Sequence, residues 1–248
     1  MIKSLPHFDY ERSLWKKGFD FVAGVDEVGR GAWAGPVVAA AVIWQRNQNL
    51  KFKIKNLKLK IDDSKRLSPK QREVAAVWIK DNCLSWGIGE VKPQVINRFG
   101  MARASKMAFR RAIMDCNRKL QNFSIDYLLI DAFYIPYVRG VQHKFQMPII
   151  RGDQKSFSIA AASIIAKVYR DSLMTSLSEQ FKFKKYRWEK NKGYGTEAHQ
   201  NAILRNGLTG LHRRDFVATW QQKFEARSTK SEHNCFAIVE TNSNILNI

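Results

Sequence analysis

Hydrophobic residues gather early in the chain into two short runs separated by a glycine-rich bend. Residues 21–25 (FVAGV) and 37–44 (VVAAAVIW) are apolar and rich in β-forming side chains. Runs of this kind, bounded by a turn, predict two buried strands paired as in a hairpin. A third apolar run at residues 125–130 (IDYLLI) predicts another buried strand.

Three later segments have the features of helices. Ser68 can cap a helix that begins with a proline, and Gln71 completes a capping box, which predicts a helix to about residue 80. Residues 93–120 are rich in Ala, Arg, Lys and Met and predict one long surface helix. Apolar residues at helical spacing predict a helix over 157–181 whose main role is packing. Strands and helices therefore alternate, which is typical of the α/β class.

Two segments have no clear apolar period. Residues 51–60 (KFKIKNLKLK) contain five lysines and no acid, which fits either a strand pair with a polar face or a mobile basic insertion. The chain after about residue 223 becomes rich in Ser, Asn and Thr. We interpret it as an appendage or a disordered end.

Composition excludes several classes of protein. The 248 residues are 45% hydrophobic, which suits one large domain or one domain with an appendage and excludes disorder of the whole chain. The longest apolar run, 13 residues over 32–44, is too short to span hydrocarbon. The N-terminus has no apolar core of a secretory signal. Three widely spaced cysteines form neither a disulfide framework nor a zinc site, so we expect a cytoplasmic protein.

The charge balance points to a polyanionic partner. Lys and Arg number 42 against 22 Asp and Glu, so the formal net charge is +20. Such a charge favours nucleic acid or an anionic membrane surface. The alternative is an ordinary basic protein with a solvated cationic face.

The acids are the candidate catalytic groups. The segment GVDEVGRGAWAG lacks the pattern of nucleotide-binding loops, and the five histidines have no zinc spacing. Asp26 and Glu27 directly follow one predicted strand, Asp131 follows another, and Asp153 precedes the long predicted helix. Sites of α/β proteins form at the carboxyl ends of strands. Each acid taken alone could equally be a strand-end or helix-cap residue.

Together these acids predict an acidic pocket within a cationic surface. Carboxylate oxygens suit hard divalent metals, and nucleic-acid hydrolysis at such clusters uses two ions about 4 Å apart. The basic surface would hold the phosphate backbone while the acids hold the metal. This division of roles is typical of a nuclease.

Six segments, in order along residues 21–216, closely resemble the bacterial ribonuclease HII family. They are AGVDEVGRGAWAGPVVAAAVI, DDSKRLSPKQRE, LLIDAF, RGDQKSFSIAAASIIAKVYRD, NKGYGTEAH and GLTGLHRRDF. The resemblance implies a ribonuclease H-like α/β fold with a central mixed sheet. It implies a catalytic domain over 21–186, preceded by an N-terminal arm (1–20). A small helical substrate-binding part (187–223) and a tail (224–248) would follow it.

The resemblance also assigns the residues of the site. Asp26, Glu27, Asp131 and Asp153 would be the catalytic metal ligands for two Mg²⁺ or Mn²⁺ ions, with the first and third shared between the ions. Substrate binding is implied for Gly29, Arg30, Gly31, Ser64, Lys65 and Tyr194.

The implied substrate residues divide by role. The Gly-Arg-Gly tripeptide would recognise the ribonucleotide at an RNA–DNA junction, because glycine lets the backbone approach a 2′-hydroxyl closely. Tyr194 would stack under the following deoxyribose, and Lys65 would approach phosphate; otherwise these are a half-buried loop tyrosine and a solvated lysine.

Some residues are ambiguous or depart from the family pattern. Phosphate contact and a purely structural role both remain open for Lys167, Arg170, His212, Arg213 and Arg214. Asp215 stands where Ser is usual and Arg151 where Lys is common, and residues 46–60 form a longer segment than we expect, which could be an added backbone-binding arm.

The implied activity is that of an endonuclease. It would cut RNA–DNA hybrids, and it would cut 5′ to single ribonucleotides in duplex DNA, leaving 3′-hydroxyl and 5′-phosphate ends. We expect a monomer that removes ribonucleotides during replication and repair. Ribonuclease HIII is a weaker interpretation, because it carries Lys at the position of Arg30 and usually a separate N-terminal domain. A binding module without catalysis would not need the acids.

Overall fold

A mixed sheet lies at the centre of the computed structural model, which describes residues 5–46, 61–120 and 123–222. Its strands are β1 (Val22–Val28), β2 (Val37–Ile43), β3 (Ser85–Val91), β4 (Tyr127–Asp131) and β5 (Gln146–Ile149), in the order β3-β2-β1-β4-β5. The first three pair antiparallel, whereas β1 pairs parallel with β4, and β4 with β5. The predicted hairpin and third strand are confirmed.

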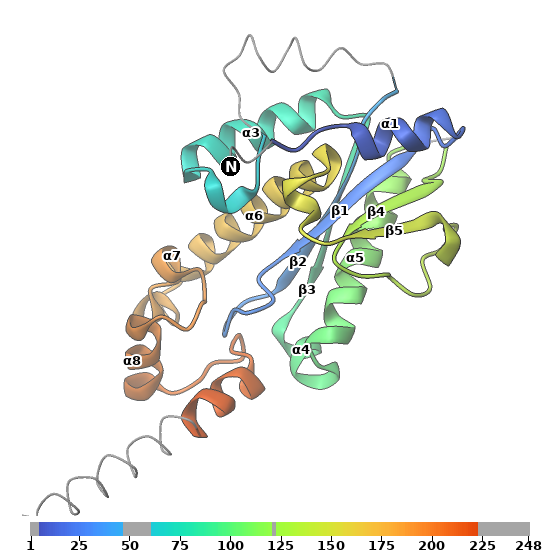
Figure 1. Ribbon diagram of the computed structural model, residues 1–248. Coiled ribbons are helices and arrows are strands. Elements are labelled where there is room, and N and C mark those ends of the chain that lie inside the picture. Colours follow the sequence, from blue (N-terminus) through green and yellow to red (C-terminus); the bar gives the residue numbers. More distant parts are fainter. Residues whose placement is uncertain (1–4, 47–60, 121–122, 223–248) are drawn as a thin grey trace, which may run out of the picture.

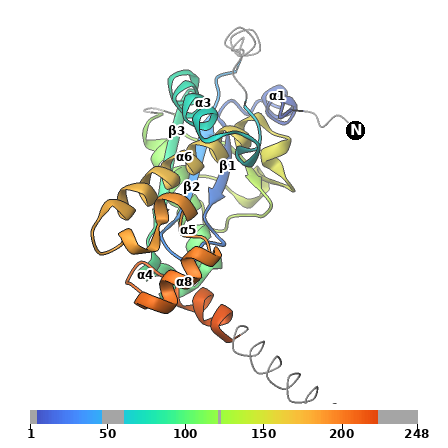
Figure 2. The same cartoon turned by 90° about the vertical axis from the view of Figure 1, so that its left-hand side faces the viewer.

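Helices cover both faces of this sheet (Figures 1 and 2). The helices of the described ranges are α1 (Asp9–Lys16), α3 (Pro69–Asn82), α4 (Pro93–Phe99), α5 (Met101–Arg118) and α6 (Phe157–Glu179), followed beyond the sheet by α7 (Trp188–Asn191) and α8 (Glu197–Asn206). Helices α6 and α3 lie over one face and α5 over the other. No helix within the described ranges is both long and apolar enough to cross a bilayer.

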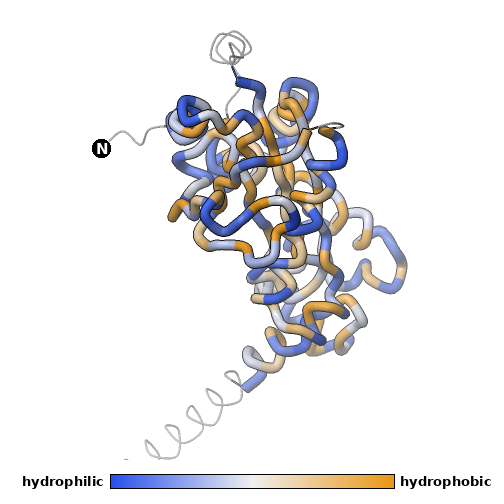
Figure 3. The backbone as a smooth tube through the Cα atoms, turned by 90° about the vertical axis from the view of Figure 1, so that its right-hand side faces the viewer, coloured by the Kyte–Doolittle hydropathy of each residue, from blue (hydrophilic) through white to orange (hydrophobic). Residues whose placement is uncertain are grey.

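The apolar run of β2 follows from its place between the two helical layers. Val38, Ala40 and Val42 pack toward α6 and α3, whereas the alternate side chains pack toward α5. A strand covered on both faces becomes continuously hydrophobic rather than alternating. Figure 3 shows the same pattern, with hydrophobic stretches through the middle of the molecule and hydrophilic ones mostly around the outside.

Glycines in the strands allow the helices to approach the sheet closely. A Cβ at Gly24 of β1 would lie 2.3 Å from the backbone carbon of Ser158 in α6. On the opposite face, a Cβ at Gly87 of β3 would lie 2.2 Å from the backbone nitrogen of Cys116 in α5. The sheet thus packs between α6 and α5, whose backbones come into direct contact with the strands at these glycines.

The helix predictions were confirmed in two places and wrong in one. The capping box of Ser68 and Gln71 is present at the start of α3, and α6 spans nearly the whole predicted range. The single helix predicted over 93–120 is instead two helices, because Gly100 adopts a φ of +78° between them. The second of these, α5, lies at the surface as predicted, with Arg103, Arg111 and Met114 exposed and the side that carries Ala104, Ala108 and Ala112 buried against the sheet.

A small helical part follows α6, as predicted for the C-terminal region. It contains α7, α8 and helical residues 214–222 around a core that includes Tyr186, Trp188, Ile203 and Val217. This core also takes Ala34 from the loop after β1, so the part packs directly against the sheet domain. The predictions for the lysine-rich segment and the tail fall outside the described residues.

Candidate active site

The strands bring two of the predicted acids side by side. Val25 of β1 pairs in parallel with Ile130 of β4, so Asp26 and Asp131 occupy the next step of neighbouring strands. We predicted that Asp26 and Glu27 would follow the strand, which is wrong: β1 continues through both of them to Val28. The strand extends because both residues still pair with β2.

Asp153 reaches the same place from a different element. It lies in a short 3₁₀ helix (Gly152–Gln154) just before α6, and its side chain is largely buried. The N–H of Gly152 donates to Asp131 Oδ1 at 2.7 Å, which ties this turn to the end of β4.

The predicted site residues line a single cavity of about 310 Å³. They are the acids Asp26, Glu27, Asp131 and Asp153 and the predicted substrate contacts Gly29, Arg30, Gly31, Ser64, Lys65 and Tyr194. Residues separated by more than 160 positions in the sequence therefore meet at one opening of the molecule.

Burial and mutual repulsion raise the pKa values of the acids. The pKa of Asp26 lies well above its ordinary value because of burial first and the charges of Glu27 and Asp131 next. Burial, followed by the charges of Asp63 and Asp131, raises the pKa of Asp153 to about 6. The pKa of Asp131 is raised mainly by burial, against the hydrogen bond from the Gly152 N–H. Because these neighbouring carboxylates repel one another when ionised, a bound cation would favour their ionised forms.

Glu27 differs from the other acids because a cation already contacts it. Arg30 Nη1 donates to Glu27 Oε1 at 3.2 Å, whereas Glu27 Oε2 is buried and has no partner among the described residues. Burial raises the pKa of Glu27, and the charge of Arg30 opposes this rise. One oxygen of Glu27 is therefore available to a further ligand.

The carboxylate oxygens of the four acids are suitable ligands for a hard divalent cation, although they do not form a preformed coordination site. Within the described ranges, no three His, Cys, Asp or Glu side chains are arranged to hold a metal ion. Several oxygens are turned toward other partners: the N–H of Glu27 donates to Asp26 Oδ1, and that of Gly152 to Asp131. The oxygen-only chemistry, the raised pKa values and the unpartnered Glu27 oxygen nevertheless fit Mg²⁺ or Mn²⁺.

Three further residues belong to this region, of which two were missed and the role of the third was left open. Asp63 raises the pKa of Asp153 by its charge, and its carboxylate accepts from the amide of Gln154 at 3.1 Å. Ser163 lines the cavity, shares a hydrogen bond with the Ser64 hydroxyl at 3.0 Å and opposes the rise in the pKa of Asp26. Lys167, whose role was left open, also lines the cavity and pairs with Asp171 at 2.8 Å. The only sequence signals were an acid beside the Ser64–Lys65 motif and polar residues on an otherwise Ala/Ile-rich helix.

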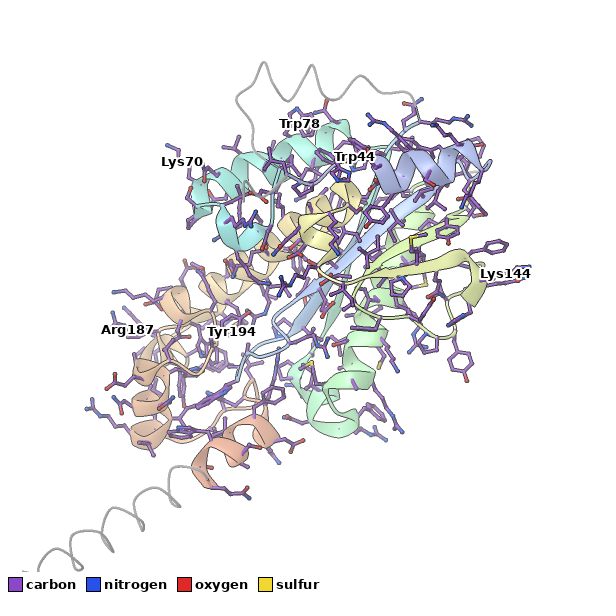
Figure 4. The ribbon with its side chains drawn as sticks, viewed as in Figure 1. Trp44, Lys70, Trp78, Lys144, Arg187 and Tyr194 are labelled. Atoms are coloured by element: carbon purple, nitrogen blue, oxygen red, sulfur yellow. The ribbon has the colours of Figure 1, made fainter. Side chains whose placement is uncertain are left out.

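Tyr194 lies between the sheet domain and the C-terminal helices (Figure 4). The side chain of Arg170 lies 5.5 Å from the centre of its ring and that of Lys167 lies 6.0 Å away. By contrast, Arg187 lies on the outer side of the C-terminal part, away from the sheet. Tyr194 is the aromatic side chain that lines the acidic cavity.

For three of the residues left open between phosphate contact and structure, burial excludes phosphate contact. Arg170, His212 and Arg213 have no exposed surface, so none can meet a phosphate at the protein surface. His212 lies 3.2 Å from His199 between their Nε2 atoms, and burial lowers the pKa of His212 to about 4, so it is neutral. Arg214 is exposed, and phosphate contact stays open for it.

Comparison with known proteins finds one family model that matches most of the chain and many similar sequences. A family model described as Ribonuclease HII matches residues 23–220. Ribonuclease HII of Bacillus subtilis (strain 168) is 44% identical over 208 residues, which are 84% of this chain and 74% of that protein.

Solved structures share the fold. The crystal structure of ribonuclease H2 from Pyrococcus horikoshii OT3 matches with a TM-score of 0.59 and 22% identity, over 83% of this chain and 99% of that chain. The crystal structure of Bst-RNase HIII in complex with Mn²⁺ matches with a TM-score of 0.57 and 18% identity, over 83% of this chain and 76% of the other. The predicted ribonuclease H-like α/β fold is confirmed.

Proposed function

Since the chain belongs to the ribonuclease HII family, and is thus an endoribonuclease of the ribonuclease H type, we propose that it also cuts at single ribonucleotides embedded in duplex DNA. The cut would fall on the 5′ side of the ribonucleotide and leave 3′-hydroxyl and 5′-phosphate ends. Such an activity would serve the removal of ribonucleotides from DNA. The binding module without catalysis is set aside, because the family is one of enzymes.

The observation that carries this proposal is the composition of one cavity. The four acids share it with the Gly-Arg-Gly tripeptide and with Tyr194. A backbone without side chains can read a 2′-hydroxyl, and an aromatic ring can support the next sugar. The groups that would hydrolyse the phosphodiester thus lie beside the groups that would recognise a single ribonucleotide.

The four carboxylates would hold two divalent ions, with Asp26 and Asp131 shared and Glu27 and Asp153 each serving one. Bound there, the ions would activate water and neutralise charge on the leaving 3′-oxygen. Residues around the carboxylates supply positive charge for the phosphate. Lys65 directs positive charge at Asp131 and lowers its pKa against the effect of burial, so it also favours an incoming phosphate.

A cleavage assay with matched duplexes tests the proposal. One DNA duplex carries a single ribonucleotide, a second is all DNA, and a third is an RNA–DNA hybrid, each incubated with Mn²⁺. We expect cuts in the first and third, and in the first a 3′-hydroxyl terminus directly 5′ to the ribonucleotide. Asp131→Asn should abolish both activities, whereas Asp81→Asn, at an exposed acid outside the cavity, should preserve them.

The two parts of the proposal fail separately. Cleavage of the hybrid without cleavage at the single ribonucleotide would refute junction recognition. Undiminished cleavage by Asp131→Asn would refute the role of the acids.

A further inference from the structure

Two arginines are completely buried beneath the loop that carries the tripeptide. Arg170 of α6 and Arg213 of the C-terminal part have no exposed surface. Within the part of the chain that the structure describes, neither guanidinium pairs with a carboxylate, and both bond to backbone carbonyl groups instead. Burying an unpaired charge is costly, so these contacts need a reason beyond packing.

Arg213 holds the tripeptide itself. Its Nη1 donates to the carbonyl oxygens of Gly29 at 2.6 Å and of Arg30 at 2.9 Å, and its Nε donates to the carbonyl of Gly35 at 3.0 Å. The side chain comes from more than 180 positions further along the sequence. One guanidinium therefore fixes two successive peptide units of the loop.

The fixed carbonyls determine where the amide groups point. In a planar trans peptide the C=O and the N–H point in opposite directions. Because the carbonyls of Gly29 and Arg30 point at Arg213, the N–H groups of Arg30 and Gly31 point away from it. Neither N–H has an acceptor within the described residues, and both residues line the acidic cavity. The space where a Cβ of Gly31 would stand is open.

Arg170 supports the neighbouring part of the same loop. It donates to the carbonyls of Ala34 and Pro36, and to that of Lys192 just before Tyr194. A Cβ on Gly29 would lie 2.2 Å from Arg170 Nε, so the guanidinium packs directly on that glycine. Both arginines form hydrogen bonds with the loop, but only Arg213 bonds to the carbonyl groups of the tripeptide itself.

Arg213 remains charged in this setting. Burial, together with the charge of Arg170, lowers its pKa to about 9, which still lies above neutral pH. A positive charge on the carbonyl side of a peptide polarises its N–H group and makes it a stronger donor.

We propose that Arg213 is a positioning residue that aims the amide groups of Arg30 and Gly31 at the 2′-hydroxyl of the ribonucleotide. Arg213 then determines how well the enzyme distinguishes a ribonucleotide from a deoxyribonucleotide without touching the substrate. This role rests on the proposed function, since it requires that the tripeptide reads the ribose.

The test is a binding ratio. Affinity is measured without divalent ions, by fluorescence anisotropy, for a DNA duplex with one ribonucleotide and for the same duplex made only of DNA. For Arg213→Lys, which keeps the charge but loses the planar fork, we expect the ratio of the two affinities to fall about tenfold, as for the loss of one net hydrogen bond of about 1.4 kcal/mol. Affinity for the all-DNA duplex should not change.

A matched control separates positioning from stability. Tyr186→Phe removes a hydroxyl that donates to the Gly207 carbonyl at 2.9 Å in the same C-terminal core, and this hydroxyl makes no hydrogen bond to the tripeptide or to Arg213. It should lower the melting temperature and leave the affinity ratio unchanged. The amide signal of Gly31 in ¹⁵N-glycine-labelled protein should shift in Arg213→Lys and not in Tyr186→Phe. If Arg213→Lys does not fold, Arg213→Gln, which removes the buried charge, takes its place.

The outcomes are distinct. An unchanged ratio in a folded Arg213 variant, with the wild type discriminating, overturns the positioning role. An equal loss of affinity for both duplexes shows a merely structural role and overturns it as well. A wild type that does not discriminate between the duplexes refutes the proposed ribose recognition, and this role falls with it.

Discussion

Replacing Asp153 by Asn should stabilise the protein when divalent ions are absent. Asp153 is 7% exposed and is surrounded by acids, and its pKa is raised to about 6, chiefly by burial. A carboxyl with a raised pKa favours the folded state while it is protonated and disfavours it once ionised. Asn has the same shape and no charge, so it removes this penalty.

The magnitude follows from the shift. One pKa unit corresponds to about 1.4 kcal/mol, so the change from 3.8 to about 6 corresponds to at most about 3 kcal/mol. Asp153 lines an open cavity, where solvent screens its charge, and we therefore expect about 1–2 kcal/mol. The stabilisation by Asn should be complete above about pH 6 and should vanish below about pH 4, where both states of the wild type are protonated.

Urea unfolding in EDTA, near neutral pH and near pH 4, measures this effect. Asp115→Asn provides a control of opposite sign: burial opposes ionisation of Asp115, but hydrogen bonds from Ile88 and Lys119 outweigh it and lower its pKa. That variant should lose stability near neutral pH. Mn²⁺ should raise the stability of the wild type more than that of Asp153→Asn. A metal-free Asp153→Asn protein that is no more stable than wild type near neutral pH would show that burial and the neighbouring acids do not raise the pKa of Asp153 as inferred.

Three other substitutions have defined outcomes. Gly29→Ala places a Cβ 2.2 Å from Arg170 Nε at a φ of +86°, so thermal unfolding should show a loss of about 2–4 kcal/mol; an unchanged melting temperature would contradict the close packing. Glu11→Ala removes the carboxylate that accepts from the Ser158 N–H at 3.0 Å in the first turn of α6, and urea unfolding should show a loss of about 1–3 kcal/mol, whereas a neutral result would mean that water replaces it. Tyr194→Ala should lower kcat/KM on the single-ribonucleotide duplex about tenfold through lost stacking, with Tyr194→Phe near wild type; equal activity of both variants would refute the stacking role.

The sequence predicts the elements whose burial follows a regular pattern. Residues 37–44 lie between two helical layers, so their side chains are apolar without interruption and the strand is evident. The capping box at Ser68 is equally local, because both of its hydrogen bonds join residues three apart. These predictions need no knowledge of the rest of the chain.

Elements that depend on distant partners were not predictable in this way. Strand β3 (Ser85–Val91) carries Gly87 and Gly89 where a strand normally has side chains, because the backbone of α5 occupies that space. Propensity alone disfavours glycine in strands. The break at Gly100 was missed because one glycine within a helical composition does not reveal its own φ.

In the site too, some residues were predictable from the sequence and others were not. The acids were found from their places near strand ends and from the family resemblance, and the structure gathers them in one cavity. The burial of Arg170 and Arg213 could not be inferred, because a basic residue in a chain of net charge +20 is expected on the surface. Their partners are backbone carbonyls, which leave no mark on the sequence.

The loop after β1 is held from both sides, and this limits how the protein can be divided. The N–H groups of Trp33 and Ala34 donate to the carbonyl of Gly193 at 2.8 and 3.1 Å, while Arg213 N–H donates to Trp33. A shortened enzyme that ends after α6 would lose these partners along with its C-terminal helices, and the loop would keep chiefly its contacts with α6. For the same reason, a chimera of two relatives should take residues 29–36 and 187–222 from one parent, since the two segments pack on each other and share backbone hydrogen bonds despite their separation in the chain.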